Sequence, residues 1–304
     1  MRVYLTGADG MLGTAFTAAL RSDPVTTGWP LHGVSAGDFD IGDRAAVAAS
    51  IDAFRPDVVV HTAAHAIVDD CEVDPALAAR VNVAGVRHVA DACRRTGSRL
   101  INLSSDYVFD GEAPPPRGYD EDDLPTPLSV YGMTKVAGER IAALVPDHLN
   151  VRTSWLFGGS DERLDTVLSV VRKAGRGERA ALIHDQFSLP TYTADLAEAL
   201  VFLLTTDRPV TGTLHLANRG TASWYEVGEH VLSLLGSESA EELAPEPVSM
   251  ADAGFIGGRP TNSTLSTDRL SALGFTLPSW QDAVARYTAT LVRPTADAAA
   301  RGAP

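Results

Sequence analysis

The sequence predicts an α/β fold in which a doubly wound parallel sheet is followed by a smaller, partly interleaved α/β domain. Three features indicate this. Short apolar segments alternate with helix-length segments up to about residue 156, which is the β-α-β-α order of a parallel sheet. A glycine-rich turn directly follows the first apolar segment. Beyond residue 156 the alternation becomes irregular, which indicates a different organisation.

The predicted strands are short runs of apolar and β-branched residues. Val58-Val59-Val60 is apolar throughout, as expected of a strand buried on both faces. Helix signals lie between the strands: Asp43 and Ser129 are N-cap residues, and a helix that Pro75 opens ends at Gly97. The predicted strands are Arg2–Thr6, Leu31–Val34, Val58–Val60, Leu100–Leu103 and Val151–Trp155.

A turn with the spacing GxxGxxG joins the first predicted strand to the first helix. Gly7 permits a tight turn, Gly10 lets the backbone approach a diphosphate, and Gly13 lets the helix pack closely on the strand. The helix N-terminus then presents N–H groups to phosphate oxygens. We predict a Rossmann-like dinucleotide-binding domain; a purely structural turn is the alternative. The predicted cofactor contacts in the turn are Gly7, Asp9, Gly10, Met11, Leu12 and Gly13.

The chain divides into a dinucleotide-binding domain, residues 1–156, and a second part, residues 157–304. We expect the second part to be mainly a substrate-binding domain, with some segments returning to the first. Residues 163–173 and 194–204 have helical periodicity, and Ser223-Trp224-Tyr225-Glu226 is a capping-box sequence before a further helix. Residues 245–259 predict loop or short strand.

A tyrosine and a lysine four residues apart lie on the helix predicted after Ser129. Tyr131 and Lys135 share one face of that helix. A phenol has an unperturbed pKa near ~10, and a neighbouring ammonium favours the phenolate and lowers that pKa. The pair can therefore move a proton to a carbonyl oxygen while a nicotinamide moves hydride to the carbon.

The third catalytic group is a hydroxyl at the end of the preceding strand. Ser105 is predicted to hydrogen-bond the substrate oxygen and Tyr131. Ser104 is the alternative, because neighbouring residues of a strand point to opposite faces. The interpretation without function is that both serines only end a strand.

The end of the second predicted strand decides between the two nicotinamide cofactors. An acidic side chain there would bind the ribose hydroxyls of NADH and repel the 2′-phosphate of NADPH. Ser35 stands at that point, so NADPH is slightly preferred and NADH stays open. Asp38 and Asp40 follow shortly after, either as ribose ligands or as solvated loop residues.

Composition and charge exclude several kinds of partner. The net charge of −14 repels nucleic-acid phosphates and anionic lipids. No run reaches the ~18 apolar residues of a membrane span, and the first residues carry no signal-peptide pattern. We therefore expect a cytoplasmic protein that binds neither nucleic acid nor membrane. Two cysteines and scattered histidines form no metal-ligand motif, so no metal is expected.

Together these segments resemble the dTDP-4-dehydrorhamnose reductase family of extended short-chain dehydrogenases. The resemblance covers nearly the whole chain and rests on the order and spacing of its motifs. They are His61-Thr62-Ala63-Ala64-His65, Val68-Asp69, Val81-Asn82, Ser104–Gly111, Tyr131–Lys135, Ala137-Gly138-Glu139, Arg152–Trp155, Asp185-Gln186, Pro190-Thr191, Ser223–Glu226 and Arg259–Ser263.

The resemblance implies reduction of a nucleotide-linked 4-keto-6-deoxy sugar in deoxysugar biosynthesis, with thymidine diphosphate as the nucleotide. Tyr131 would donate the proton to the new hydroxyl, Lys135 would hold the ribose, and Ser105 would bind the keto oxygen. Many relatives dimerise, so a homodimer is also implied. The implied cofactor contacts are Asp40, Ile41, Ala63, Ala64, Tyr131 and Lys135, and the implied substrate contacts are Ser105, Asp106, Trp155 and Arg259.

The sequence departs from the family at several positions, which leaves the sugar open. Ser105 stands where threonine is usual, and residues 161–164 and 186–189 differ from the usual substrate-domain pairs. Ala15 stands where some members have a magnesium-binding carboxylate. The alternatives are a nucleotide-sugar epimerase of the same superfamily and a non-catalytic subunit like the methionine adenosyltransferase regulatory chain. A dehydratase is disfavoured, because Asp106-Tyr107 stands where dehydratases have Asp-Glu.

Overall fold

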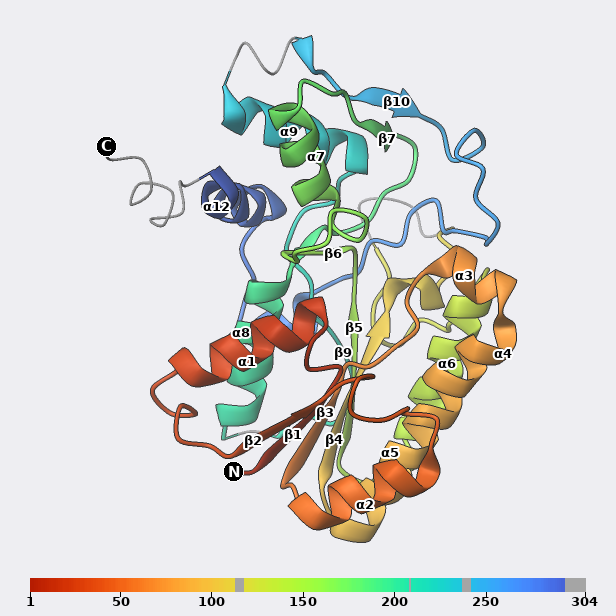
Figure 1. Ribbon diagram of the computed structural model, residues 1–304, viewed down its shortest axis with the longest axis vertical. Coiled ribbons are helices and arrows are strands. Elements are labelled where there is room, and N and C mark those ends of the chain that lie inside the picture. Colours follow the sequence, from red (N-terminus) through yellow and green to blue (C-terminus); the bar gives the residue numbers. More distant parts are fainter. Residues whose placement is uncertain (113–117, 208, 237–241, 293–304) are drawn as a thin grey trace, which may run out of the picture.

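The computed structural model describes residues 1–112, 118–207, 209–236 and 242–292. Six strands form one parallel sheet in the order β2-β1-β3-β4-β5-β9 (Figure 1). The chain order reverses between β1 and β3, the point where nucleotides bind in such sheets. The strands are β1 Val3–Thr6, β2 Leu31–Val34, β3 Val58–His61, β4 Arg99–Ser105, β5 His148–Thr153 and β9 Gly212–His215.

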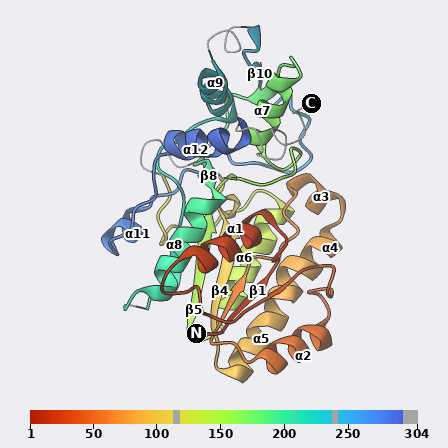
Figure 2. The same ribbon diagram turned by 60° about the vertical axis from the view of Figure 1, so that its left-hand side comes forward.

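Helices cover both faces of this sheet, so the predicted doubly wound α/β fold is confirmed. Helices α1 (Met11–Ser22) and α8 (Thr193–Thr205) cover one face (Figures 1 and 2). The other face carries α2 (Arg44–Phe54), α5 (Val86–Thr96) and α6 (Val130–Ala142), with α3 (Val68–Val73) and α4 (Pro75–Ala79) beside α6. Cover on both faces explains why β1 and β3 are buried along their whole length.

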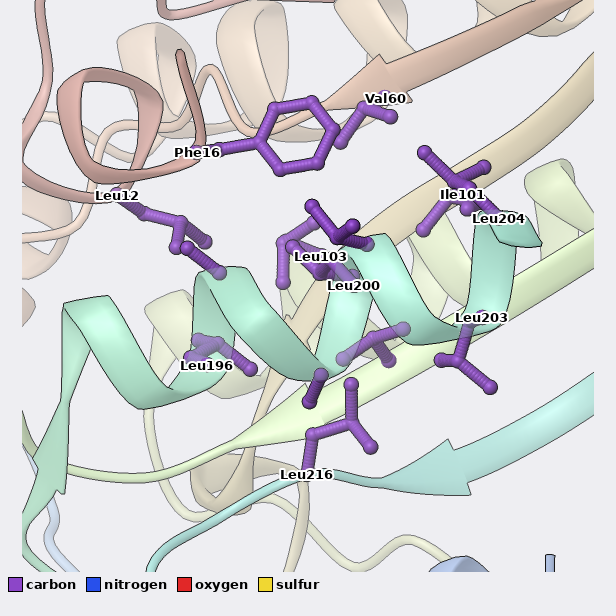
Figure 3. Close-up of a cluster of buried hydrophobic side chains, with 14 of the residues drawn as sticks. Leu12, Phe16, Val60, Ile101, Leu103, Leu196, Leu200, Leu203, Leu204 and Leu216 are labelled. Atoms are coloured by element: carbon purple, nitrogen blue, oxygen red, sulfur yellow. The ribbon is translucent and has the colours of Figure 1, made fainter. Parts of the chain in front are cut away.

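The largest hydrophobic core lies between the sheet and the pair α1 and α8. Phe16 of α1 and Leu200 of α8 are fully buried and point towards strand residues such as Ile101 (Figure 3). Burying a side chain of this size stabilises a fold by ~1.5–3 kcal/mol. The packing fixes the N-terminus of α1 at the carboxyl edge of the sheet, where the glycine turn is needed.

A second hydrophobic core lies beyond that edge, in the upper part of Figure 1. It is formed by α7 (Thr166–Gly175), α9 (Trp224–Leu235) and α12 (Trp280–Val292), with two short sheets. One sheet pairs β6 (Leu156–Phe157) with β8 (Thr191–Tyr192), and the other pairs β7 (Ala181–Ile183) with β10 (Glu246–Val248). The segments α8 and β9 return to the large sheet between these elements, and α11 (Asp268–Ala272) lies beside β9.

Most predicted helix ends agree with the structure. Asp43 caps α2, Ser129 caps α6 and Ser223 closes a capping box at α9. The helix predicted from residue 163 begins three residues later, because Asp165 accepts from the N–H of Leu168. The strand predicted to reach Trp155 ends at Thr153, since Trp155 adopts a left-handed φ of 42°.

Candidate active site

The glycine turn has the geometry that a bound diphosphate needs. Gly7 has a φ of 68°, and a Cβ there would lie 2.9 Å from the backbone nitrogen of Ala63. A Cβ on Gly13 would lie 2.1 Å from the carbonyl oxygen of Gly7, so only glycine permits this packing. Gly10 is the N-cap residue of α1, and no described side chain caps the helix there. The residues present therefore fit the phosphates of a dinucleotide.

The other predicted cofactor contacts line the same edge of the sheet. Ala63 and Ala64 lie in the loop after β3, and Ala63 donates its N–H to Thr6 Oγ1 at 3.3 Å. The Ile41 side chain packs against Gly85 of α5's N-terminal turn. Asp40 accepts the N–H of Gly42 at 2.7 Å and forms an ion pair with Arg80. Its carboxylate is therefore already partnered.

Ser35 stands directly after β2, as predicted, and it is hydrogen-bonded to the carboxylate of Asp38. The backbone N–H of Ser35 donates to Asp38 Oδ2 at 2.8 Å, and its hydroxyl donates to the same oxygen at 3.1 Å. Asp38 is exposed. The end of β2 thus combines a neutral hydroxyl, which tolerates a 2′-phosphate, with an acid that suits ribose hydroxyls.

The three predicted catalytic residues lie together at the carboxyl edge of the sheet. Ser105 ends β4, and its hydroxyl lies near that of Tyr131 on α6. Lys135, one helical turn further, donates from Nζ to the carbonyl oxygen of Leu103 at 2.5 Å. Ser129 accepts from the N–H of Gly132 and fixes the start of this helix.

Burial controls the acidity of both groups on α6. Burial raises the pKa of Tyr131, and the hydrogen bond with Ser105 opposes this. The pKa is therefore raised and not lowered as expected, and the phenol keeps its proton, as a proton donor must. Burial lowers the pKa of Lys135 to about 8, while the carboxylate of Glu139 raises it.

The two neighbouring serines of β4 point to opposite faces, as strand geometry requires. Ser104 Oγ donates to Glu139 Oε1 at 2.6 Å, away from Tyr131. Glu139 also forms a buried ion pair with Arg152, at 2.8 Å between Oε1 and Nε. Ser104 therefore belongs to a buried structural network with Glu139 of α6 and Arg152 of β5, and Ser105 is the hydroxyl at the site.

Asp106, an expected substrate contact, is enclosed by protein. It is 1% exposed, and its carboxylate accepts four serine hydroxyls. Burial raises the pKa of Asp106, and these hydrogen bonds oppose the rise. A direct substrate contact would require this enclosure to open.

Two tryptophans stack beside the catalytic residues. The ring centroids of Trp155 and Trp224 are 4.6 Å apart, with an interplanar angle of 10°. Trp155 holds a left-handed backbone conformation that costs roughly 1–3 kcal/mol in a non-glycine residue and is frequent at functional sites. Tyr107, next to this pair, accepts a hydrogen bond from Gln186 Nε2 at 3.2 Å.

Arg259 reaches the site region from the loop before α11, but it has a partner. Its Nη1 donates to Asp69 Oδ1 at 2.9 Å, and the guanidinium lies 3.6 Å from the Phe255 ring centroid. Asp69 Oδ1 also accepts the N–H groups of Ile256 and Gly257, at 3.1 and 3.0 Å. A substrate diphosphate would have to share Arg259 with Asp69.

Asn82 is a buried residue to which the sequence assigned no role. Its Oδ1 accepts from His65 N–H at 2.8 Å, and its Nδ2 donates to Thr134 Oγ1 at 3.0 Å. It thereby ties the segment after β3 to the catalytic helix. The only signal was its place in the resemblance, because the π-helical turn Arg80–Gly85 that carries it has no sequence signature.

Neither a metal cluster nor a membrane span occurs in the part of the chain that the structure describes. A parallel sheet with a glycine turn, and a Tyr-x-x-x-Lys pair at its carboxyl edge, defines the class of NAD(P)-dependent short-chain dehydrogenases and reductases. Comparison with known proteins narrows this class to one family.

Residues 1–293 match the family model described as the RmlD substrate binding domain, and the chain belongs to this family. It is 33% identical to dTDP-4-dehydrorhamnose reductase of Sinorhizobium fredii, over 98% of this chain and 100% of that one. The enzyme of the same name from Streptomyces griseus is 37% identical, over 93% and 91%. A crystal structure of the Bacillus anthracis dTDP-4-dehydrorhamnose reductase with NADP has a TM-score of 0.86 at 32% identity, covering 95% and 99%.

Proposed function

We propose that the protein reduces the C4 keto group of a dTDP-linked 4-keto-6-deoxy sugar, with NADPH or NADH, in deoxysugar biosynthesis. The observation that carries this proposal is the meeting of Ser105, Tyr131 and Lys135 beside the glycine turn. The family relatives named as dTDP-4-dehydrorhamnose reductases support the substrate class.

The chemistry divides between the cofactor and the chain. When bound, the reduced nicotinamide supplies the hydride. Tyr131, which burial keeps protonated, donates its proton to the oxygen that was the ketone. Ser105 holds that oxygen, and Lys135 holds the nicotinamide ribose and favours the phenolate left on Tyr131.

The remaining contacts follow from the positions of the side chains. Gly7, Asp9, Gly10, Met11, Leu12 and Gly13 would hold the cofactor phosphates, with Asp40, Ile41, Ala63 and Ala64 on the adenosine side. Trp155 would face the sugar nucleotide, and Arg259 would reach its diphosphate after giving up part of its bond to Asp69. The division into residues 1–156 for the cofactor and 157–304 mainly for the substrate belongs to this proposal.

Nicotinamide absorbance with a panel of nucleotide-linked sugars tests the proposal. Each 4-keto-6-deoxy sugar is tested with NADPH and with NADH. Cofactor oxidation with a dTDP-linked 4-keto sugar is the expected result. The proposal is wrong if the protein binds the cofactor but none of the keto sugars in the panel causes cofactor oxidation. In that case, interconversion of nucleotide sugars without net cofactor oxidation would identify an epimerase. The absence of both sugar reduction and sugar interconversion would identify a regulatory subunit.

The same experiment ranks the cofactors. We expect a slight preference for NADPH, because Ser35 at the end of β2 is neutral, and Asp38 keeps NADH usable. The proposal further includes a cytoplasmic homodimer. It also includes that the protein binds no nucleic acid, and the net charge of −14 supports this last point. Light scattering tests the homodimer, and a gel-shift assay tests the absence of nucleic-acid binding.

A further inference from the structure

The carboxylate of Asp106 is surrounded by serine hydroxyls. Its Oδ1 accepts from Ser105 Oγ at 3.1 Å. Its Oδ2 accepts from Ser154 at 3.1 Å, Ser188 at 2.9 Å and Ser263 at 2.5 Å. We call Ser154, Ser188 and Ser263 the serine cage.

The serine cage gathers segments that are distant in sequence. Ser154 follows β5, Ser188 precedes β8, and Ser263 lies in the loop before α11. Ser188 Oγ is also 2.5 Å from Ser154 Oγ and 3.1 Å from Ser263 Oγ. All three serines are at most 1% exposed. The carboxylate is therefore solvated by protein hydroxyls in place of water.

An arrangement of this kind is not explained by stability alone. The hydrogen bonds to the Asp106 carboxylate within the described residues come from serines, and no described lysine or arginine forms an ion pair with it. Burying a carboxylate without a cation is costly, and apolar side chains of similar size often stabilise a fold as well or better. The neighbour through which the carboxylate reaches the reaction is Ser105.

Asp106 fixes the direction of the single hydroxyl hydrogen of Ser105. A serine hydroxyl has one hydrogen and two lone pairs. The hydrogen of Ser105 points to Asp106, and one lone pair accepts the N–H of Tyr107 at 3.2 Å. The other lone pair is left free on the side where the Tyr131 hydroxyl and the substrate oxygen would lie.

The serine cage explains how Ser105 becomes free to serve the substrate. To donate to a keto oxygen, the Ser105 hydroxyl must turn its hydrogen away from Asp106. Three hydroxyls on Oδ2 keep the carboxylate hydrogen-bonded when this happens. The cost of the turn is then one hydrogen bond out of four.

We propose that Asp106 and the serine cage form a positioning unit that orients the Ser105 hydroxyl, whose hydrogen lies on Asp106 in the free site and turns to the keto oxygen in the complex. The proposal rests on the proposed reductase function and assigns Asp106 no direct contact with substrate. Its effect passes through Ser105, so it appears in kcat and leaves the cofactor Kd unchanged.

A double-mutant cycle tests this route. Asp106→Asn is expected to lower kcat at least about tenfold in the presence of Ser105, and less than about twofold in a Ser105→Ala background, because residues that act as a unit are non-additive. Equal losses in both backgrounds, or an unchanged kcat in Asp106→Asn, would overturn the proposal. The cofactor Kd and the Tm are measured on all four proteins.

A second pair of variants covers the case in which Asp106→Asn does not fold. Ser188→Ala with Ser263→Ala removes two cage hydroxyls without changing charge, so the carboxylate holds the Ser105 hydrogen more tightly and kcat falls. Ser98→Ala is the matched control, since Ser98 is also a buried serine but donates to the carbonyl oxygen of Pro56, far from the site. A cage variant that behaves like Ser98→Ala, or that loses as much in the Ser105→Ala background, contradicts the proposal.

A substrate-free measurement separates this inference from the proposed function. The NMR signal of the hydroxyl-bearing ring carbon of Tyr131, assigned with Tyr131→Phe, reports the hydrogen bond to Ser105. We expect Ser105→Ala to move this signal in the parent protein and to move it much less when Asp106 is Asn. Equal movement in both would overturn the positioning role. A parent protein that reduces no keto sugar would overturn only the reductase function.

Discussion

Two walls of the site are built in different ways. The sheet wall consists of the glycine turn, Ser105, Tyr131 and Lys135, which stand on regular elements whose places are set by strand register and helix packing. The loop wall consists of Trp155, Gln186 and Arg259, which stand on irregular segments held by side-chain hydrogen bonds.

The difference teaches how one fold can keep its chemistry and vary its substrate. A change in the sheet wall disturbs a packed core or a backbone register, so it affects cofactor binding and hydride transfer. A change in the loop wall breaks individual polar contacts of irregular segments that a rigid scaffold carries, so we expect it to affect sugar binding. Each prediction below tests one side of this division.

The largest effect is expected at the proton donor of the sheet wall. Tyr131→Phe removes the proton that the new hydroxyl receives, and we expect kcat to fall roughly a thousandfold. The cofactor Kd should stay within about twofold, because the phenol hydroxyl contributes little to phosphate binding. Absorbance kinetics and cofactor fluorescence titration measure the two quantities. Unchanged turnover would exclude Tyr131 as the acid.

The next effect is expected at the glycine turn. Gly13→Val places a branched side chain where even a Cβ would lie 2.1 Å from Gly7 O, so α1 must move. We expect a loss of about 1–3 kcal/mol in stability and about tenfold or more in cofactor affinity. Gly28→Ala is the control, because a Cβ there has no atom within 4 Å. The comparison between the walls would fail if Gly13→Val weakened only sugar binding.

The third prediction concerns pH and the sheet wall. Because burial lowers the pKa of Lys135 to about 8, the lysine is charged below that pH and neutral above it. We expect cofactor affinity to weaken about tenfold as pH rises from 7 to 10, since the ammonium proposed to hold the nicotinamide ribose is lost. Lys135→Met should bind the cofactor weakly, with no such pH dependence. A parallel decline in both proteins would assign the effect to another group.

The smallest effect is expected in the loop wall. Asp69→Asn weakens the contact that holds Arg259 and the loop at Ile256 and Gly257. We expect KM for the sugar nucleotide to change about fivefold, with kcat and cofactor Kd nearly constant. Arg95→Gln is the control, because its ion pair with Asp52 is exposed and joins α5 to α2. A large change in kcat would show that the two walls are not independent.

The sheet wall could be predicted from sequence because its signals are local. The GxxGxxG spacing, the valine run of β3 and the caps at Asp43 and Ser129 each describe a short stretch of backbone. Tyr131 and Lys135 share a helix face by spacing alone. These residues needed no knowledge of distant neighbours.

The loop wall and the serine cage could not be predicted in this way. Ser154, Ser188 and Ser263 meet around Asp106 from three irregular segments, with no periodicity in common. The pKa of Tyr131 was expected to fall, but it rises, and burial by tertiary packing is the largest cause. A local pattern does not report desolvation.

The position of β9 in the large sheet has a consequence for how this chain can be altered. Because Gly212–His215 pair with β5, a fragment ending at residue 156 would leave the edge of β5 open to other chains. The reverse also holds. The segment between β5 and β9 leaves the sheet and returns to the same edge. Within it, α8 packs on the large sheet. Parts of that segment can be lengthened, shortened or exchanged between relatives while the sheet keeps all six strands, which makes it the natural place to graft a different sugar preference.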